Sequence, residues 1–170
     1  MARDDEFAAF VAARYRALVR TGLLLISDSG HAEDLAQSAL IRTYLAWGRL
    51  RDPANAEAYA RRTLVRLALR ARQRRWTGEI AAGPVPDQSP GPAAEAGQDD
   101  LVLDVRRALA ALPAGQRAVL VLRYLDDQSE TETARLLGIS PGTVTSRAAR
   151  GLASLRQAGL LDLEGGRHDR

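Results

Sequence analysis

The stretch from Ser129 to Arg156 constrains the fold of this chain more than any other, because two short helical patterns meet there at a break. The first pattern ends at Gly138, and glycine readily adopts the left-handed conformation that terminates a helix. Ser140 is a favoured N-cap and Pro141 a favoured first helical residue. Two helices joined by a three-residue turn that contains glycine predict a helix-turn-helix, whose second helix can enter the major groove of DNA.

The second of these helices separates apolar from polar residues. Its apolar face carries Val144, Ala148, Leu152 and Leu155. Its other faces carry hydroxyl and guanidinium groups, on Thr143, Thr145, Ser146, Arg147 and Arg150. An ordinary helical hairpin is the alternative interpretation. The agreement of the cap, the glycine, the Ile139 plug and the polar outer face favours a DNA-binding element.

The charge is distributed unevenly along the chain. The net charge is +3, and all 24 basic residues are arginine. Residues 1–76 carry 14 arginines against 8 acidic residues, and residues 101–170 carry 10 against 8. Residues 77–100 carry 5 acidic residues and no basic one. Two basic blocks on either side of an acidic connector indicate a polyanionic partner.

The first 76 residues show helical spacing and no alternating strand pattern. Apolar residues recur three and four apart from Glu6 to Ile26, from about Ala32 to Leu50, and from about Ala56 to Trp76. The break at Ser27–Gly30 and the proline-containing loop at Arg51–Asn55 separate these predicted helices.

The third predicted helix carries a row of like charges. Its arginines at positions 62, 66, 70 and 74 lie four residues apart, and no acidic residue occurs between Ala58 and Trp76. Like charges at this spacing oppose helix formation slightly. A chain that keeps them usually has an anionic partner, so contact with phosphates is the predicted role, with a solvated face as the alternative. Such binding would weaken steeply with salt.

Composition divides the chain into two helical parts. Residues 77–100 contain four prolines with glycine, alanine and acidic residues, which predicts a flexible acidic linker; a passive spacer is the alternative. Helical spacing resumes from Leu101 to Leu112 and from Arg117 to Leu125, before the helix-turn-helix. We therefore expect an all-α fold with two small helical domains, at residues 1–76 and 101–158, and a tail at residues 159–170.

No pattern typical of an enzyme, a metal site or a cofactor site occurs in the sequence. The absence of cysteine excludes disulfides and thiolate metal sites and fits a reducing compartment. His31 and His168 have no neighbouring set of ligands. The start has no apolar run of signal-peptide length, and the run from Leu23 to Ile26 is too short to span a bilayer. We expect a cytoplasmic, non-enzymatic protein without a cofactor or membrane insertion.

The order of these segments resembles the small bacterial RNA polymerase sigma factors of the extracytoplasmic-function group, which carry only region 2 and region 4. HAEDLAQSALIRTYLAW at residues 31–47 resembles the family's AEDLxQ segment and the helix that follows it. Residues 52–75 resemble the promoter-opening segment, and residues 112–156 closely resemble region 4. VAARYRALVRTGLLL, at residues 11–25, resembles the sigma-E subgroup in particular. The resemblance implies a region 2 bundle at 1–76 and a region 4 helix-turn-helix at 101–158.

For region 2 the resemblance implies two kinds of contact. Glu33, Asp34, Leu35 and Gln37 would contact the coiled coil of the largest subunit of core RNA polymerase. The loop from Gly48 to Asn55 would receive an unstacked base of the −10 element. The separated strand would be lined by Tyr44, Trp47, Tyr59 and the stripe from Arg61 to Arg75, which includes Arg61, Arg62, Arg66 and Arg70. Aromatic rings can stack splayed bases and arginines can follow the backbone, although core packing is the alternative for the aromatic residues.

For region 4 the resemblance implies that the helix from Pro141 to Leu155 lies in the major groove of the −35 element. Arg150 is the first candidate for a contact to a base or a phosphate. The residues that would face promoter DNA are Thr143, Ser146, Arg147, Ala149 and Arg150. The linker would thread towards the RNA exit path. An anti-sigma factor is a usual further partner in the family, and the sequence does not identify one.

Three positions depart from the family pattern. Arg66 stands where asparagine is common, Thr145 where a basic residue is common, and Ala149 where a bulkier one is common. The first departure should alter the base preference at the −10 element. The other two should weaken or alter reading of the −35 element.

The leading hypothesis is a sigma subunit that binds core polymerase and directs promoter-specific initiation of transcription. A stand-alone helix-turn-helix regulator is the main alternative, but it leaves the acidic helix start at Glu33–Asp34 and the arginine row unexplained. A helical adaptor without DNA contact is a third possibility, and the arginine row argues against it.

Overall fold

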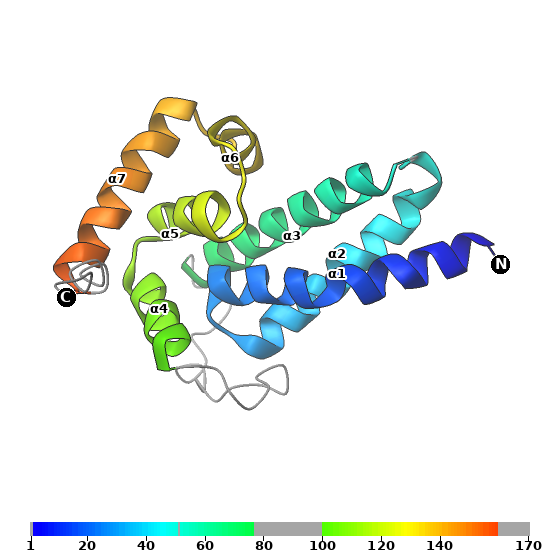
Figure 1. Cartoon of the computed structure of the whole chain (residues 1–170), viewed down its shortest axis with the longest axis horizontal. Helices are drawn as coiled ribbons and strands as arrows, with labels where there is room; N and C mark the ends of the chain where they lie inside the picture. The colour runs from blue at the N-terminus through cyan, green and yellow to red at the C-terminus, as the bar shows by residue number, and fades with distance from the viewer. Residues whose placement is uncertain (1, 51, 77–99, 160–170) are drawn as a thin grey trace, which may run out of the picture. The chain divides into compact units, whose positions relative to one another are not determined.

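The chain forms two compact units, Met1–Ala93 and Ala94–Arg170, and each is described by itself. The computed structural model describes residues 2–50, 52–76 and 100–159. Within these ranges all regular secondary structure is helical (Figure 1), so the predicted all-α fold is confirmed. Apart from Asp100 and Gly159, the predicted linker and tail lie outside the described residues. No helix among those described is long and apolar enough to span a membrane.

Unit 1 is a bundle of three helices that all contact one another. It consists of α1 (Ala2–Ile26), α2 (Ser29–Ala46), a 3₁₀ turn η1 (Trp47–Arg49) and α3 (Pro53–Trp76). Helices α1 and α3 run in the same general direction, and α2, which lies between them in the sequence, runs in the opposite direction (Figure 1). Small buried residues allow the helices to approach closely. They are Gly22, Ala32, Ala36, Ala39, Ala56, Ala60 and Ala68.

Helices α2 and α3 both begin earlier than predicted, because an acidic side chain caps the start of each. Asp28 is the N-cap of α2 and accepts a hydrogen bond from the His31 amide at 3.0 Å, so α2 begins at Ser29 rather than Ala32. Asp52 accepts one from the Ala54 amide at 3.0 Å, and α3 begins at Pro53 rather than Ala56. At its other end α2 stops at Ala46, before η1, instead of continuing to Leu50.

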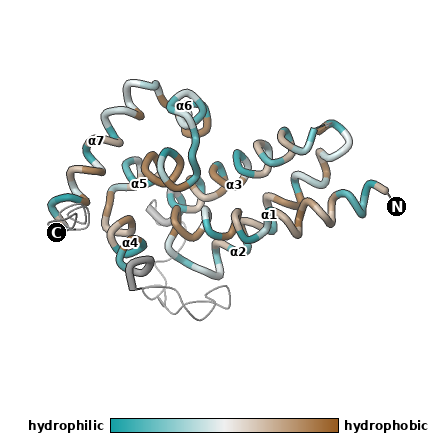
Figure 2. Tube along the Cα trace, in the orientation of Figure 1, coloured by the Kyte–Doolittle hydropathy of each residue, from teal (hydrophilic) through white to brown (hydrophobic). Residues whose placement is uncertain are grey.

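Unit 2 consists of α4 (Asp100–Ala111), α5 (Ala114–Leu120), a π-helical turn η2 (Val121–Leu125), α6 (Glu130–Leu137) and α7 (Pro141–Gln157). Figure 2 shows hydrophobic residues along α5, and the five residues from Ala118 to Leu122 are all buried. A helix is therefore present where Arg117 to Leu125 was predicted. It starts three residues earlier, directly after Pro113, and ends as a π turn.

The left-handed glycine, the Ser140 cap and the Ile139 plug predicted for the helix-turn-helix are present, and Ser129 adds a second cap. Ser129 accepts a hydrogen bond from the Glu132 amide at 3.0 Å at the start of α6. Gly138 ends α6 in the left-handed region with φ 66°. Ser140 then accepts one from the Thr143 amide at 3.2 Å at the start of α7. Ile139 packs against a core of Val119, Ala134 and Val144 that holds α5, α6 and α7 together.

Candidate nucleic-acid interface

The outer face of α7 combines exposed and anchored side chains. Of the five residues predicted to face DNA, Ser146, Ala149 and Arg150 are exposed, whereas Thr143 and Arg147 are half-buried. The hydroxyls of Ser140 and Thr143 are hydrogen-bonded to each other at 2.8 Å. The Ser146 hydroxyl donates to the Thr143 carbonyl at 3.2 Å. This hydroxyl is therefore held against the helix and offers its lone pairs outward.

The two predicted arginines of α7 differ in their surroundings. The Arg147 guanidinium lies against the start of α5, where a Cβ added to Gly115 would be 2.8 Å from its Nη1. Arg150 is exposed and has no hydrogen-bond or ion-pair partner among the described residues. The two arginines lie one turn apart on the same helix. Arg147 is packed within unit 2, whereas the guanidinium of Arg150 is available for a contact with DNA.

The arginines of α3 also fall into distinct groups. Arg66 and Arg70 are exposed and have no hydrogen-bond or ion-pair partner in the described part of the chain. Arg72 donates to the Leu25 carbonyl at 3.0 Å, and its partial burial lowers the pKa of its guanidinium. Arg62 is half-buried, at the start of the predicted row. The exposed part of the row thus consists of its last three members, Arg66, Arg70 and Arg74.

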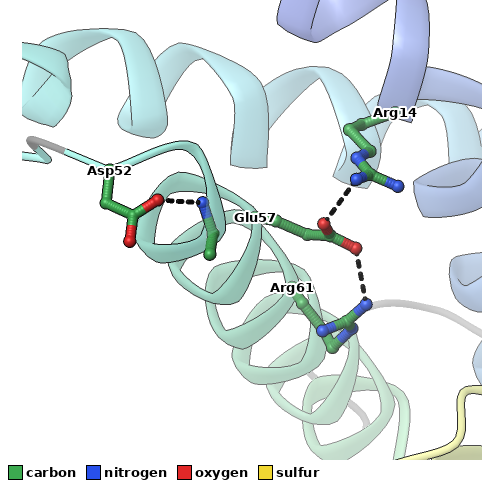
Figure 3. Close-up of polar contacts among 5 residues, drawn as sticks. Arg14, Asp52, Glu57 and Arg61 are labelled. Atoms are coloured by element: carbon green, nitrogen blue, oxygen red, sulfur yellow. Dashed lines mark hydrogen bonds and ion pairs between the residues drawn. The ribbon is translucent and has the colours of Figure 1, made fainter.

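Arg61 is paired, unlike Arg66 and Arg70 of the same helix. The carboxylate of Glu57, which is the acidic residue of α3, bridges Arg61 at 3.0 Å and Arg14 of α1 at 2.8 Å (Figure 3). The contact with Arg14 ties α3 to α1, and the contact within α3 neutralises part of the charge of Arg61. Sequence reasoning missed Glu57 and Arg14, because the second contact joins residues 43 positions apart.

Two of the three predicted aromatic residues, Tyr44 and Trp47, pack against α1. Tyr44 and Trp47 have ring centroids 5.0 and 5.1 Å from that of Phe7, and Trp47 lies 5.2 Å from Phe10. The Tyr44 hydroxyl donates to Asp4 at 2.8 Å, and this hydrogen bond raises the pKa of Tyr44. Core packing, the alternative interpretation of these aromatic residues, therefore accounts for part of the surface of each ring.

These rings nevertheless keep some accessible surface. Tyr44 remains 38% exposed, and Trp47 is half-buried. The third predicted aromatic, Tyr59 of α3, is also half-buried.

The four residues predicted to contact polymerase lie in the first half of α2. Asp34 and Gln37 are exposed, Glu33 is half-buried and Leu35 is buried. The polar members of the set therefore form an accessible surface, while Leu35 supports the helix from its inner side. Among the described residues no group of three or more histidine, cysteine or acidic side chains could hold a metal ion.

Unit 2 also contains an apolar cavity of about 270 Å³, which no sequence pattern predicted. It lies between α4, η2 and the second half of α7. The larger side chains that line it are Val105, Leu109, Leu120, Tyr124, Leu152 and Leu155.

Comparison with known proteins supplies the family. Sigma-70 region 2 matches residues 10–77, and Sigma-70, region 4 matches residues 103–155. The RNA polymerase sigma-E factors of Streptomyces avermitilis and Streptomyces coelicolor are each 38% identical over 153 residues. These matches span 89% of this chain and 84% and 85% of the two relatives. The chain belongs to the RNA polymerase sigma factors.

Further similarities place this sigma factor in the extracytoplasmic-function group. The ECF RNA polymerase sigma factor SigM of Mycobacterium tuberculosis is 35% identical over 141 residues, which are 83% of this chain and 70% of SigM. The fold is that of the sigma factor RpoE of Bartonella quintana, whose structure was solved in complex with the anti-sigma factor NepR. That similarity has a TM-score of 0.72 at 23% identity and covers 93% of this chain and 98% of RpoE.

The comparisons confirm the predicted family and, with it, a function in transcription initiation. They also decide against a stand-alone helix-turn-helix regulator as the leading interpretation, because such a protein has no need of region 2. The match to region 2 instead covers most of α1 and the whole of α2 and α3.

Proposed function

We propose that this sigma factor binds core RNA polymerase through the outer face of α2 and contacts promoter DNA through α3 and α7. The observation that carries the proposal is the match of both units to sigma regions, combined with exposed arginines on α3 and α7. Residues 1–76 would bind core and the −10 element, and residues 101–158 the −35 element. The protein would act in the cytoplasm and catalyse no reaction itself.

At the −10 element, Arg66 and Arg70 are the best-placed phosphate contacts, because both are exposed and unengaged among the described residues. The partly accessible rings of Tyr44, Trp47 and Tyr59 would meet bases of the separated strand, with Arg62 beside them. Arg61 would contribute less, because Glu57 already occupies its guanidinium. The segment from Gly48 to Asn55 would receive a splayed base.

At the −35 element, α7 would lie in the major groove with Arg150 towards base edges or phosphates. Thr143, Ser146 and Ala149 would line the groove around it. Arg147 would act mainly by holding α7 against α5, since its guanidinium lies over Gly115. An anti-sigma factor as a further partner stays a prediction.

A run-off transcription assay with purified core polymerase tests the proposal. Promoter-specific transcripts should appear only when this protein is added. Tight binding to duplex DNA without any association with core would contradict it and support a stand-alone regulator.

Asp34→Arg tests the docking surface directly. Asp34 is exposed, so reversal of its charge should abolish binding to core while leaving the thermal unfolding temperature unchanged. Arg42→Ala, at another exposed position of α2, serves as the control. Affinity for core equal to that of the wild type in Asp34→Arg would remove Asp34 from the docking surface.

A further inference from the structure

The apolar cavity of unit 2 has an exposed apolar rim. Its inner wall includes Leu109 of α4 and Leu120 of α5, which are both buried. At its rim, Val105, Tyr124 and Leu125 are 37%, 53% and 46% exposed. Single exposed apolar residues are common on protein surfaces, but several around one apolar cavity are typical of a binding site. The contacts proposed above with core polymerase and with DNA use none of these side chains.

The cavity lies between helices that the core of unit 2 holds unequally. The core cluster around Val119, Ala134 and Val144 joins α5, α6 and α7, and no described residue of α4 belongs to it. Leu152 and Leu155, in the last two turns of α7, line the cavity and are half-buried. An apolar segment in the cavity would therefore bury surface of α4 and α7 together and hold α4 in place.

Helix α7 ends in a motif that turns the chain back along the helix. Gly159 has φ 76°, in the left-handed region, and its amide donates a hydrogen bond to the Arg156 carbonyl at 2.9 Å. This is one of the two hydrogen bonds of a Schellman motif, in which the residue after the glycine commonly makes an apolar contact with the helical residue five positions before it. In this chain those two residues are Leu160 and Leu155. Because Leu155 lines the cavity, this contact would bring Leu160 to its edge.

We propose that residues 160–163 occupy the cavity and hold α4 against the end of α7. Their sequence is LLDL, and they lie outside the residues that the structure describes. Leu161 and Leu163 are two residues apart, so they share one face of an extended segment and would fill the cavity. Asp162 would face the solvent, because none of the side chains that line the cavity is charged and a carboxylate is costly to bury without a partner.

The segment is long enough for this placement, and the cavity is large enough. Leu155 and Leu152 lie four and seven residues before Gly159, which is about 6 Å and about 10 Å along the helix. Four extended residues span about 13 Å. The cavity volume of about 270 Å³ exceeds the roughly 150 Å³ of an apolar cavity that binds benzene, so leucine side chains can enter.

Covalent attachment favours this segment over a second copy of the chain or another protein. Residues 160–163 follow α7 almost directly, so they stay near the cavity at an effective concentration on the order of millimolar. Any apolar partner in solution has to compete with them. Occupation by the segment would also cover the apolar rim of the cavity in the free protein.

Disulfide trapping in the full-length protein tests the placement, because the chain has no cysteine of its own. Tyr124→Cys, at the rim, is combined with Leu163→Cys and treated with a mild oxidant. The control combines Leu163→Cys with Thr131→Cys, at an exposed position of α6 that does not line the cavity. A disulfide needs Cα atoms within about 7 Å, so the first pair should form an intramolecular disulfide at least about tenfold faster than the control pair.

Hydrogen exchange of the α4 amides tests the apolar contact. Leu161→Ser combined with Leu163→Ser should speed this exchange by roughly 5- to 30-fold, because α4 loses the burial that holds it. Exchange of α3 in unit 1 should not change and serves as an internal reference. Leu161→Ile combined with Leu163→Ile keeps the apolar area and should stay within about twofold of the wild type. Asp162→Asn should also match the wild type, since its side chain would face the solvent.

Each alternative occupant gives a different result. Equal rates for the two cysteine pairs, or wild-type exchange of α4 in the serine variant, would overturn the proposal. Disulfides that join two molecules would overturn it and assign the cavity to a second copy of this chain. Protection of α4 that appears only with added core polymerase, in the wild type and the serine variant alike, would overturn it in favour of a partner. The two main measurements use this protein alone, so failure of the proposed function would leave them unaffected.

Discussion

At the scale of single residues, similar side chains in this sigma factor have different surroundings and so different expected roles. Arg147 and Arg150 lie one turn apart on α7, yet the first rests against Gly115 and the second is exposed. Arg61 and Arg66 lie on one helix, yet the first pairs with Glu57 and the second is unengaged among the described residues. Residue type alone would predict that all four arginines contact DNA.

Arg150→Ala should lower the affinity of the holoenzyme for a promoter by about 1–3 kcal/mol if the guanidinium makes a bidentate contact with a base. The loss should be confined to DNA that carries the −35 element. Arg156→Ala, at an exposed position in the last turn of α7, is the control and should change affinity little. An unchanged promoter profile for Arg150→Ala, measured by competition binding, would reject the role of Arg150.

Tyr44 should ionise above the usual range for tyrosine, because its hydroxyl donates to the Asp4 carboxylate and this bond raises its pKa. Since the folded protein favours the protonated form, the stabilisation is complete below the unfolded pKa of about 10 and is lost as pH rises through the higher folded pKa. An absorbance titration of tyrosinate checks this. Tyr44→Phe should remove the component with the high midpoint, and Asp4→Asn should lower that midpoint. No change in either variant would show that the bond is not formed in solution.

At the scale of helices, what could be predicted depends on how far apart in the chain the interacting residues lie. Gly138 and Ser140 act on residues within one turn, so local sequence specifies the helix-turn-helix. Asp28 fits the break before α2 as well as the cap of α2, because aspartate is favoured at both positions, so the sequence alone does not specify where α2 begins. The contacts of Glu57 with Arg14 and of Tyr44 with Asp4 join different helices, and no local pattern indicates them.

Gly151 shows how a helix contact depends on the absence of a side chain. A Cβ at this buried position of α7 would lie 2.8 Å from Leu120 Cδ1 of α5, so Gly151→Ala should overpack the contact and destabilise unit 2 by about 1–3 kcal/mol. Gly142→Ala is the matched control on the same helix, because its Cβ would meet only Ser140 Oγ at 4.0 Å. Urea unfolding distinguishes the two variants. Equal stability of both would show that α5 and α7 shift apart without cost.

At the scale of the whole molecule, two units with exposed arginines contact one polyanion at separate elements in the proposed function. Linked binding of this kind multiplies affinity, because the second contact forms at a high effective concentration once the first is made. Each unit should then contribute its own phosphate contacts to the salt dependence of promoter binding. The net charge of +3 does not indicate that both units are basic, since the acidic residues 77–100 offset the charge of the basic parts.

Combining Arg66→Ala with Arg70→Ala should therefore change the salt dependence for one promoter element only. Each lost phosphate contact on a single strand reduces the slope of log affinity against log salt by about 0.7, so the double variant should lose about 1.4 on promoters whose −10 strand is open. The slope for an isolated −35 duplex should stay the same, because that element meets only α7 in the proposed arrangement. Arg20→Ala, an exposed arginine of α1, controls for the general loss of positive charge. Equal reductions for both DNAs would mean that α3 contributes only a diffuse field, and its arginine row would then be no binding site for the separated strand.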